Sequence, residues 1–450
     1  MDENSGSQDA SDDDPPVGVI SGDTTQLSPS EVPSSSSLNP SVQRDWNDWR
    51  WQMRHRIRAV SQLKDLFGSL DNAVGVADAA SKYPFAITPY YASLIRKPDD
   101  SDPIFRMSVP QAQELFDPPF LRSDPLEENR DMPVPGLVHR YRDRALLMVT
   151  TTCAMYCRHC TRKRIAGVRE SVISPTRLRE AVDYLQAHPE VHDVIISGGD
   201  PFTLTTDALQ RVLAAIRSVP TVDVIRIGTR TPVTLPMRIT ARLTSMLRKF
   251  HPIWVNTHFN HPNELTPQSA EACARLADAG IPLGNQSVLL RGINDNPQTM
   301  ERLCRGLLRM RVRPYYLFQC DLVCGVEHFR TPLSAGIQIM EYLRGRVSGI
   351  GIPTFVVDAP GGRGKIPVLP NYVVSSSPTH TVLRNFRGEL VSYAEPWAPA
   401  DWDRAPIVDA ANPTVYDHAA GWESPADSID VLPRLPGCRP DLRNPGGAQR

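Results

Sequence analysis

Three cysteines stand close together in Cys153-Ala-Met-Tyr-Cys157-Arg-His-Cys160, separated by three and then two residues. Thiolates are the usual protein ligands of iron–sulfur clusters, and such short spacings let one loop surround one cluster. Four cysteines commonly complete a cluster of the cubane type, but no fourth cysteine lies within reach of this loop. The spacing therefore predicts a cluster in which one iron has no protein ligand and is open to a small molecule.

Two other interpretations of the same cysteines are available. They could form part of a zinc site with His159 as the fourth ligand. His159 lies between Cys157 and Cys160, however, which makes a tetrahedral arrangement around one ion awkward. Free buried thiols are the weaker alternative, because packing gives cysteines no reason to cluster at these spacings. We favour the iron–sulfur cluster.

Composition indicates a large globular protein of 450 residues, 41% of them hydrophobic. A formal net charge of −1 gives no basic excess for binding nucleic acid or an acidic membrane surface. No apolar run reaches the roughly 18 residues of a membrane helix, and the N-terminus lacks the pattern of a secretory signal. Eight cysteines, three of them clustered, fit a reducing compartment. We therefore expect a cytoplasmic protein with no membrane or nucleic-acid partner.

The chain divides into five segments by composition. Residues 1–43 are rich in Ser, Asp and Pro without Lys or Arg, which predicts a disordered acidic tail. Residues 44–142 are predicted to form a helical N-terminal region, and residues 143–350 a domain of alternating strands and helices. Residues 351–396 hold a glycine-rich loop and a C-terminal segment, and residues 397–450 a Pro-rich tail.

The N-terminal region opens with an apolar stripe that is typical of one helix face. The stripe consists of Trp46, Trp49, Met53, Ile57, Val60, Leu63 and Leu66. Its simplest role is packing, and no chemistry is assigned to it.

Strand-like runs alternate with amphipathic segments from about residue 145 onward. The predicted strands are Leu146–Thr151, Val194–Ser197, Val222–Ile227, Ile253–Thr257, Leu283–Val288 and Arg313–Phe318, with Thr354–Val357 as a further candidate. The predicted helices are 175–187, 206–218, 238–250, 266–279, 297–310 and 333–346. Parallel neighbours need a crossover helix, so six such repeats indicate a parallel sheet. We predict an α/β fold, a partial (β/α)6-type barrel with a helical N-terminal region and an extended C-terminal segment.

In such folds the chemistry gathers where the strands end. Gly198, Gly199 and Asp200 follow the second predicted strand, where paired glycines let a ligand approach the backbone and a carboxylate can bind an ammonium group. A plain Gly-Gly turn is the alternative. Polar residues around His258 follow the fourth strand, and Gln286 lies in the fifth.

A second cofactor is suggested by Lys365, which stands in the glycine-rich loop after the last apolar run. A lysine at a barrel mouth could bind pyridoxal phosphate covalently, although an isolated loop lysine is more often a surface residue. Arg140, Tyr141 and Arg144 precede the first predicted strand. Their guanidinium groups suit a phosphate, and solvated charges are the alternative.

Taken in order, these motifs resemble the lysine 2,3-aminomutase family of radical S-adenosylmethionine (SAM), pyridoxal phosphate-dependent enzymes. The resemblance runs from about Trp46 to about Pro396. Its blocks are CAMYCRHCTRKR, SGGDP, RIGTRTPV, VNTHFNHPNE, PLGNQSVLLRGIND, RVRPYYLFQCD, HFRTP, PTFVVDAPGGRGK and PVLPNYV. Several long blocks in one order are more specific than any single motif.

The resemblance implies a role for each matching residue. Cys153, Cys157 and Cys160 would bind a 4Fe-4S cluster whose open iron chelates SAM. Lys365 would carry pyridoxal phosphate. Other positions would contact the cofactors: Arg140, Tyr141, Arg144, Gly198, Gly199, Asp200, His258 and Gln286. The substrate carboxylate would bind to Arg162, and its distal ammonium group to Asp321 and Asp358.

The resemblance also implies the reaction, the conversion of L-lysine to β-lysine. Cleavage of SAM would give a 5′-deoxyadenosyl radical that takes hydrogen from the substrate's β-carbon. The α-amino group, held as an aldimine of pyridoxal phosphate, would then migrate to that carbon. Two carboxylates require a basic side chain, since an apolar one would leave buried charges unpaired. L-Arginine is an alternative substrate, and a non-catalytic iron–sulfur protein is a less favoured function.

This sequence departs from the family pattern at several positions. Asn296 stands where family members have a zinc-binding cysteine, and Cys438 has no cysteine cluster around it, so we expect no zinc. Phe318 replaces a tyrosine near the pyridoxal phosphate, and Cys324 has no assigned role. The resemblance further implies an electron donor such as flavodoxin or ferredoxin, and a homo-oligomer.

Overall fold

The computed structural model describes residues 45–68 and 73–395. The predicted acidic tail (1–43) and Pro-rich tail (397–450) lie outside the described residues. The described residues form two units, one comprising residues 45–68, 73–372 and 386–388 and the other residues 373–385 and 389–395. The first unit contains all the predicted site residues.

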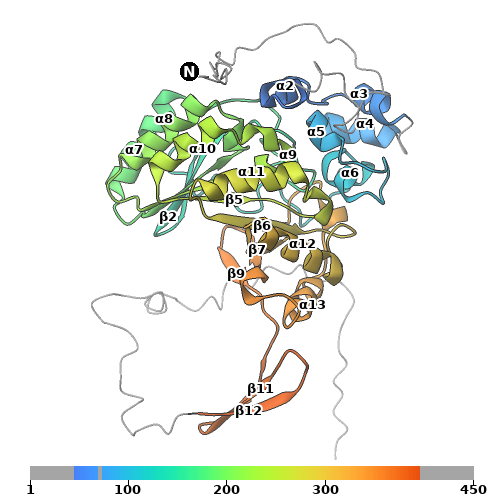
Figure 1. Cartoon of the computed structure of the whole chain (residues 1–450), viewed down its shortest axis with the longest axis vertical. Coiled ribbons are helices and arrows are strands. Elements are labelled where there is room, and N and C mark those ends of the chain that lie inside the picture. The colour runs from blue at the N-terminus through green and yellow to red at the C-terminus, as the bar shows by residue number, and fades with distance from the viewer. Residues whose placement is uncertain (1–44, 69–72, 396–450) are drawn as a thin grey trace, which may run out of the picture. The chain divides into compact units, whose positions relative to one another are not determined.

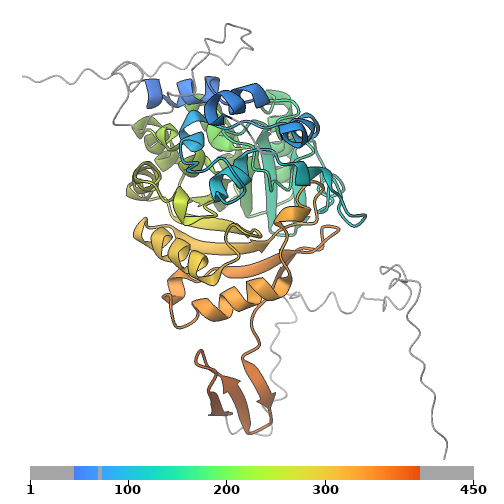
Figure 2. The ribbon, with the colours of Figure 1, turned by 90° about the vertical axis from the view of Figure 1, so that its right-hand side faces the viewer.

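One nine-stranded sheet forms the centre of this unit (Figures 1 and 2). Its strands follow one another in chain order: β1 Leu137–Tyr141, β2 Arg144–Thr150, β3 Asp193–Gly198, β4 Val224–Gly228, β5 Ile253–Thr257, β6 Leu283–Leu289, β7 Arg313–Gln319, β8 Thr354–Asp358 and β9 Lys365–Pro367. Strands β2 to β8 are parallel, whereas β1 and β9 pair antiparallel at the two edges. Because β1 and β9 do not pair with each other, the sheet is an open partial barrel, which confirms the predicted fold class.

Helices connect the parallel strands, as crossover connections require. They are α7 Pro175–Ala187, α8 Thr206–Arg217, α9 Thr231–Thr234, α10 Ala241–Leu247, α11 Pro267–Asp278, α12 Pro297–Arg309 and α13 Leu333–Leu343. Most of the longer helices begin after a residue whose side-chain oxygen accepts a hydrogen bond from one of the first backbone N–H groups of the helix. Asn296 has this role in α12, where it accepts from the amides of Gln298 and Thr299 at 3.0 and 3.1 Å.

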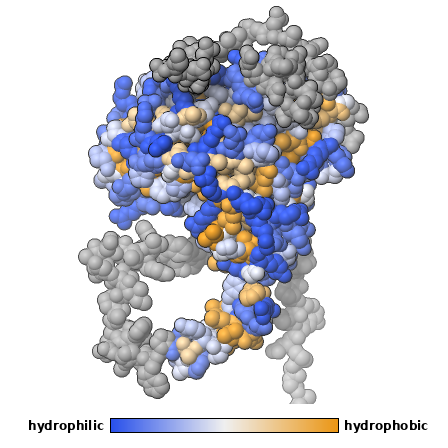
Figure 3. All heavy atoms as spheres, in the orientation of Figure 1, coloured by the Kyte–Doolittle hydropathy of each residue, from blue (hydrophilic) through white to orange (hydrophobic). Residues whose placement is uncertain are grey.

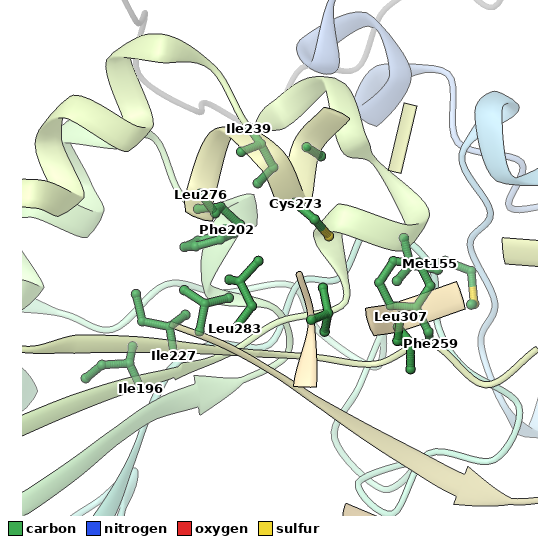
Figure 4. Packing of buried hydrophobic residues seen from close by; sticks show 14 of the residues in the cluster. Met155, Ile196, Phe202, Ile227, Ile239, Phe259, Cys273, Leu276, Leu283 and Leu307 are labelled. Atoms are coloured by element: carbon green, nitrogen blue, oxygen red, sulfur yellow. The ribbon is translucent and has the colours of Figure 1, made fainter. Parts of the chain in front are cut away.

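The main core lies between the sheet and these helices (Figure 4). Ile196, Ile227 and Leu283 project from the strands toward Leu276 and Cys273 of α11. All five side chains are buried. Apolar burial of this extent is the main driving force for the fold, and it fixes the strand ends around which the site is built.

The N-terminal region contains α2 Trp49–Arg54, α3 Val60–Phe67, α4 Ala73–Lys82, α5 Pro89–Ala92 and α6 Pro103–Ser108. The prediction of one apolar helix face from Trp46 to Leu66 is wrong, because the helix stops at Arg54. Ile57 instead pairs with Ile87 through backbone hydrogen bonds of 2.8 and 3.0 Å. The spacing of apolar residues cannot reveal this pairing, because Ile57 would be buried both in a continuous helix and in the pairing with Ile87. Strand β1 also lies within the region predicted as helical.

A buried ion cluster joins this region to the cysteine loop. Glu114 has no exposed surface and accepts from Arg158 Nε at 2.9 Å and from Lys163 Nζ at 2.7 Å. Burial opposes ionisation of Glu114, but the two cations outweigh it and lower the pKa of the carboxyl group. The three charges therefore hold residues 158–163 against the N-terminal region.

The Glu114→Gln variant is expected to unfold at lower denaturant concentration. Arg158 and Lys163 would be left buried without their counter-charge, which costs about 3–5 kcal/mol when a buried ion pair is broken. Chemical unfolding followed by circular dichroism measures the loss. The matched control is Glu271→Gln, which removes the exposed pair with Arg275 and should change stability by less than about 1 kcal/mol. Equal losses in the two variants would contradict the expectation.

The second unit contains a three-stranded antiparallel sheet of β10 Val373–Ser376, β11 His380–Arg384 and β12 Leu390–Ala394. Part of the predicted extended C-terminal segment thus forms strands. Several apolar side chains on these strands are exposed, and Figure 3 shows apolar surface over this small sheet. Across both units, no helix of the described residues is long and apolar enough to cross a membrane.

Candidate active site

One cavity of about 910 Å³ is lined by every residue that the sequence analysis assigned to a cofactor or to the substrate. These residues come from the cysteine loop after β2, from β1 and the strand ends of the sheet, and from β9. The structure therefore brings together all the predicted positions, although they are spread over more than 200 residues of sequence. Their individual contacts differ in several cases from what the resemblance implied.

The cysteine loop is held by backbone contacts to the N-terminal region. The amide of Tyr156 donates to the carbonyl of Ala86 at 3.1 Å, and the amide of Arg158 to that of Met107 at 3.0 Å. Arg56 donates to the carbonyl oxygen of Cys153 at 2.6 Å. The N-terminal region thus fixes the loop that presents the three sulfur atoms to the cavity.

The electrostatics of the three thiols suit a positively charged inorganic partner. Desolvation raises the pKa of Cys153, and it raises the pKa of Cys160 to about 11 with a further contribution from Cys157. Deprotonation of Cys153 and Cys160 for ligation would therefore require iron or another cation that stabilises the thiolates. An iron–sulfur cluster fits this donor set, because its irons hold the ligating sulfurs apart.

The zinc alternative would use His159 as a fourth ligand beside the three cysteines. In residues 45–68 and 73–395, no three Cys, His, Asp or Glu side chains converge on a single-ion position. His159 is buried, and its Nε2 atom lies 3.2 Å from the side-chain amide of Asn260. Its Nδ1 atom is buried and has no hydrogen-bond partner among the described residues.

The Gly198-Gly199-Asp200 turn packs directly against the chain that leads into the cysteine loop. A Cβ atom on Gly198 would clash with the carbonyl oxygen of Thr150, and Gly198 also has a φ of +123°. The Asp200 carboxylate is buried and accepts from Thr229 Oγ1 at 2.6 Å and from the amide of Arg230 at 2.7 Å. Asp200 thus ties β3 to β4, whereas the sequence suggested a carboxylate that binds the ammonium group of a ligand.

Arg162 is held by a residue that the sequence analysis did not single out. Glu128 is buried and accepts from Arg162 Nη2 at 2.7 Å and from Arg164 Nη2 at 2.9 Å. Burial opposes its ionisation, but Arg162 and Arg164 outweigh this and lower the pKa of Glu128 to about 2. Arg162 Nη1 faces Ser197 and Gly198 at the end of β3. Glu128 therefore orients a guanidinium group in the cavity wall.

Lys365, Asp358 and Asp321 form an ionic group contributed by β9, the end of β8 and the chain after β7. Lys365 Nζ lies 2.6 Å from Asp358 Oδ1 and 4.9 Å from the centre of the Phe318 ring. Asp321 accepts from Thr161 Oγ1 at 2.7 Å. Desolvation, followed by repulsion from Asp358, raises the pKa of Asp321 to about 7. Lys365 thus pairs directly with Asp358, while Asp321 feels the charges of both and keeps its proton to higher pH than a free carboxyl group.

Asp321 by itself should contribute a loss of stability as the pH rises from about 4 to about 7, because native Asp321 binds its proton more tightly than the unfolded chain does. The Asp321→Asn variant lacks this loss. The free energy of unfolding of the variant, relative to that of the parent, should therefore increase by on the order of 2 kcal/mol between pH 5 and pH 8. Urea unfolding of the cofactor-free proteins at pH 5 and pH 8 measures the difference. Exposed Asp207→Asn is the control, and a pH-independent difference for Asp321→Asn would refute the expectation.

The predicted phosphate-binding residues line the same cavity and lie beside the segment that carries Lys365. Arg140 Nε pairs with Asp131 at 2.6 Å, and the Arg144 guanidinium lies 3.9 Å from the centre of the Tyr141 ring. The hydroxyl of Tyr141 accepts from the backbone amide of Lys365 at 2.9 Å. Tyr141 thus connects β1 to the lysine of β9, and the two arginines stand beside it.

His258 is uncharged at neutral pH, because desolvation and the nearby Arg230 lower its pKa to about 4. Arg230 follows β4 within the RIGTRTPV block and was not singled out from the sequence, although it stands at a strand end. It is buried, and its Nη1 atom donates to Cys157 Sγ at 2.7 Å. Position after a strand was the available signal for Arg230, whereas no sequence signal indicated Glu128.

Two family models match this chain. Residues 147–304 match the model described as Radical SAM superfamily, and residues 340–419 match the model described as Lysine-2,3-aminomutase. The L-lysine 2,3-aminomutase of Clostridium subterminale is 53% identical over 353 residues, which are 78% of this chain and 85% of that relative. The chain belongs to the lysine 2,3-aminomutase family. This confirms the resemblance seen in the sequence blocks.

Other members of the lysine 2,3-aminomutase family are also similar. The L-lysine 2,3-aminomutase of Fusobacterium nucleatum is 52% identical over 78% of this chain and 83% of its own length. The glutamate 2,3-aminomutase of Clostridioides difficile is 44% identical over 79% of this chain and 84% of its own length. The family therefore contains proteins named for substrates of opposite side-chain charge, which makes the charge of the cavity informative.

Solved structures overlap this chain only in part. SuiB from Streptococcus suis bound to S-adenosylmethionine is 13% identical, with a TM-score of 0.38 over 48% of this chain and 51% of that chain. A radical SAM methyltransferase from Sphaerobacter thermophilus is 17% identical, with a TM-score of 0.39 over 49% and 68%. These overlaps add nothing to the family assignment.

Proposed function

We propose that this protein is an L-lysine 2,3-aminomutase, an isomerase that moves the α-amino group of L-lysine to the β-carbon. The observation that carries the proposal is the single cavity that holds both the three cysteines and Lys365 with its two aspartates. The similarity to enzymes named L-lysine 2,3-aminomutase supports it independently. A non-catalytic iron–sulfur protein would need neither Lys365 nor the two aspartates in this cavity.

Membership in the radical SAM superfamily implies an iron–sulfur cluster and SAM. We assign the cluster to Cys153, Cys157 and Cys160, and pyridoxal phosphate to Lys365. When bound, the cluster with SAM supplies a radical that abstracts hydrogen, and pyridoxal phosphate supplies a π-system through which the amino nitrogen can migrate. The chain's own residues bind and orient these groups and keep water away from them.

The Gly198-Gly199 turn exposes backbone beside the cysteine loop, which suits the amino-acid end of SAM. Arg140 and Arg144 suit the phosphate of the second cofactor, because guanidinium groups bind phosphate oxygens in pairs. Arg162, fixed by Glu128, is directed to bind the substrate carboxylate. His258 is neutral and can line the site without adding charge.

The charge of the cavity favours a basic substrate. Asp321 and Asp358 lie together, and their shared cation is Lys365. If Lys365 holds the cofactor covalently, its positive charge is no longer available to both carboxylates. The distal ammonium group of L-lysine would restore the balance, whereas the carboxylate of glutamate would be repelled. L-Arginine remains the second candidate, because paired carboxylates also suit a guanidinium group.

The test is an anaerobic assay of the reconstituted protein with SAM, pyridoxal phosphate and dithionite. L-Lysine, L-arginine and L-glutamate are offered separately, and β-amino acids are measured by mass spectrometry. We expect β-lysine from L-lysine at the highest rate, and a large loss in kcat/KM for Asp358→Asn. Activity on L-glutamate alone, or no β-amino acid from any of the three, would refute the proposal.

Several further features remain proposals from the sequence. These are a flavodoxin or ferredoxin as electron donor, a homo-oligomeric state, a cytoplasmic location and the absence of zinc. Anaerobic reconstitution with each candidate donor, measured by the rate of SAM cleavage, tests the first of them.

A further inference from the structure

Arg230 is a buried residue that contacts one of the proposed cluster ligands. It follows β4 and begins α9, and its Nη1 atom lies 2.7 Å from Cys157 Sγ. The side chain is almost fully withdrawn from solvent. A charged guanidinium in this position needs compensation, because burying an unpaired charge is costly.

The remaining donors of Arg230 are fixed by other elements. Nη2 donates to Glu264 Oε1 at 2.7 Å and to the hydroxyl of Tyr91 at 3.3 Å, and Nε donates to the carbonyl of His258 at 3.1 Å. The backbone amide of Arg230 donates to Asp200 at 2.7 Å. These contacts leave the guanidinium little freedom, so Nη1 stays directed at the sulfur.

We propose that Arg230 is a positioning residue for the cluster, which donates a hydrogen bond to the Cys157 ligand and makes the cluster easier to reduce. The inference rests on the proposed cluster at Cys153, Cys157 and Cys160. The step concerned is the transfer of one electron from an external low-potential reductant, such as a reduced flavoprotein, to the cluster. The reductant loses one electron, the cluster gains one, and no bond is broken.

The physical reason is the change in charge on reduction. The reduced cluster carries one more negative charge than the oxidised cluster, and much of it resides on the sulfurs. A guanidinium donor beside one sulfur stabilises the reduced state more than the oxidised state, and hydrogen bonds to ligating sulfurs are known to set cluster potentials. Glu264 holds the opposite side of the guanidinium and keeps the pair neutral overall, which leaves the directed hydrogen bond as the principal effect.

The experiment compares midpoint potentials of reconstituted proteins by anaerobic spectroelectrochemical titration, with iron content measured on each sample. Arg230→Met should shift the midpoint to a more negative value, and Arg230→Lys should shift it less because it keeps a cationic donor. The matched control is Arg238→Met, which removes a buried arginine that donates to the carbonyls of Phe202 and Leu204. Its midpoint should remain that of the parent.

Arg230→Met leaves Glu264 without its cation, so the double variant Arg230→Met/Glu264→Gln guards against misfolding. It should show the same negative shift. An unchanged midpoint in a folded, iron-loaded Arg230 variant would overturn the proposal, as would an equal shift in Arg238→Met. Loss of iron from both folded Arg230 variants would also overturn it, because Arg230 would then build the site rather than set its potential. No substrate is used, so failure of the lysine assignment would not affect the result, and a parent protein that binds no cluster would refute the proposed function instead.

Discussion

Replacing Lys365 with alanine is expected to lower turnover by a factor on the order of 10^4, because the residue that binds pyridoxal phosphate covalently is lost. After dialysis the variant should retain no absorbance of protein-bound pyridoxal phosphate. It should still bind iron and cleave SAM slowly, since the cysteine loop is held by the N-terminal region, whereas the Lys365 side chain contacts Asp358 and Phe318. Absorbance spectra and a coupled turnover assay measure both effects.

The control for this variant lies in the same loop. Arg363→Ala changes an exposed residue two positions earlier, and it should keep bound pyridoxal phosphate and activity. If Lys365→Ala retained the cofactor absorbance and turned over L-lysine like the parent, Lys365 would be an ordinary lysine of the cavity wall. The proposed assignment of pyridoxal phosphate would then be wrong.

The contacts of Lys365 connect the cofactor with substrate choice. Its ammonium group lies 2.6 Å from Asp358, one of the two residues proposed to bind the distal ammonium group of the substrate. In the described structure, the Lys365 ammonium group therefore occupies the position at Asp358 where the side chain of a substrate lysine would bind. Covalent use of Lys365 would free Asp358, and a basic substrate would then supply the missing charge. Cofactor attachment and recognition of a basic side chain would thus be linked through one carboxylate.

The sequence predicted the sheet closely because its strands carry local signals. Strand Ile253–Thr257 was predicted with its observed bounds, and the predicted helix 175–187 coincides with α7. A buried parallel strand is a continuous apolar run, and a helix on its surface has an apolar period and a capping residue. Since strand ends meet at one edge of such a sheet, the gathering of Gly198, His258 and Asp321 in one cavity was also predictable.

Contacts made through tertiary structure were not predictable in the same way. Ile57 pairs with Ile87 across an N-terminal region that has no helical continuity, and both residues are simply apolar in sequence. Glu128 lies in a segment without periodicity, yet it orients Arg162. Asp200 lies in the cavity wall, but its carboxylate is occupied by neighbouring donors. Which partner a polar group finds depends on chain segments that meet only after folding.

Replacing Cys160 with alanine is expected to abolish detectable turnover, with a loss on the order of 10^4 or more, because the cluster would have two protein ligands in place of three. Iron bound per chain and the visible absorbance of the reconstituted cluster should fall sharply. Pyridoxal phosphate should remain bound, since Lys365, Tyr141 and the arginines beside it belong to the other side of the cavity. Cys160→Ala and Lys365→Ala should therefore show opposite patterns of cofactor loss.

Cys324→Ala is the matched control, because Cys324 is partly buried and lies in the loop after β7 rather than among the cavity residues. It should keep iron, pyridoxal phosphate and activity. Wild-type iron content in Cys160→Ala would show that the residue is no cluster ligand. Joint loss of both cofactors would show that the cluster also supports the lysine side of the cavity. Loss of iron alone is the expected outcome, because the two cofactors are proposed to bind independently on either side of one substrate.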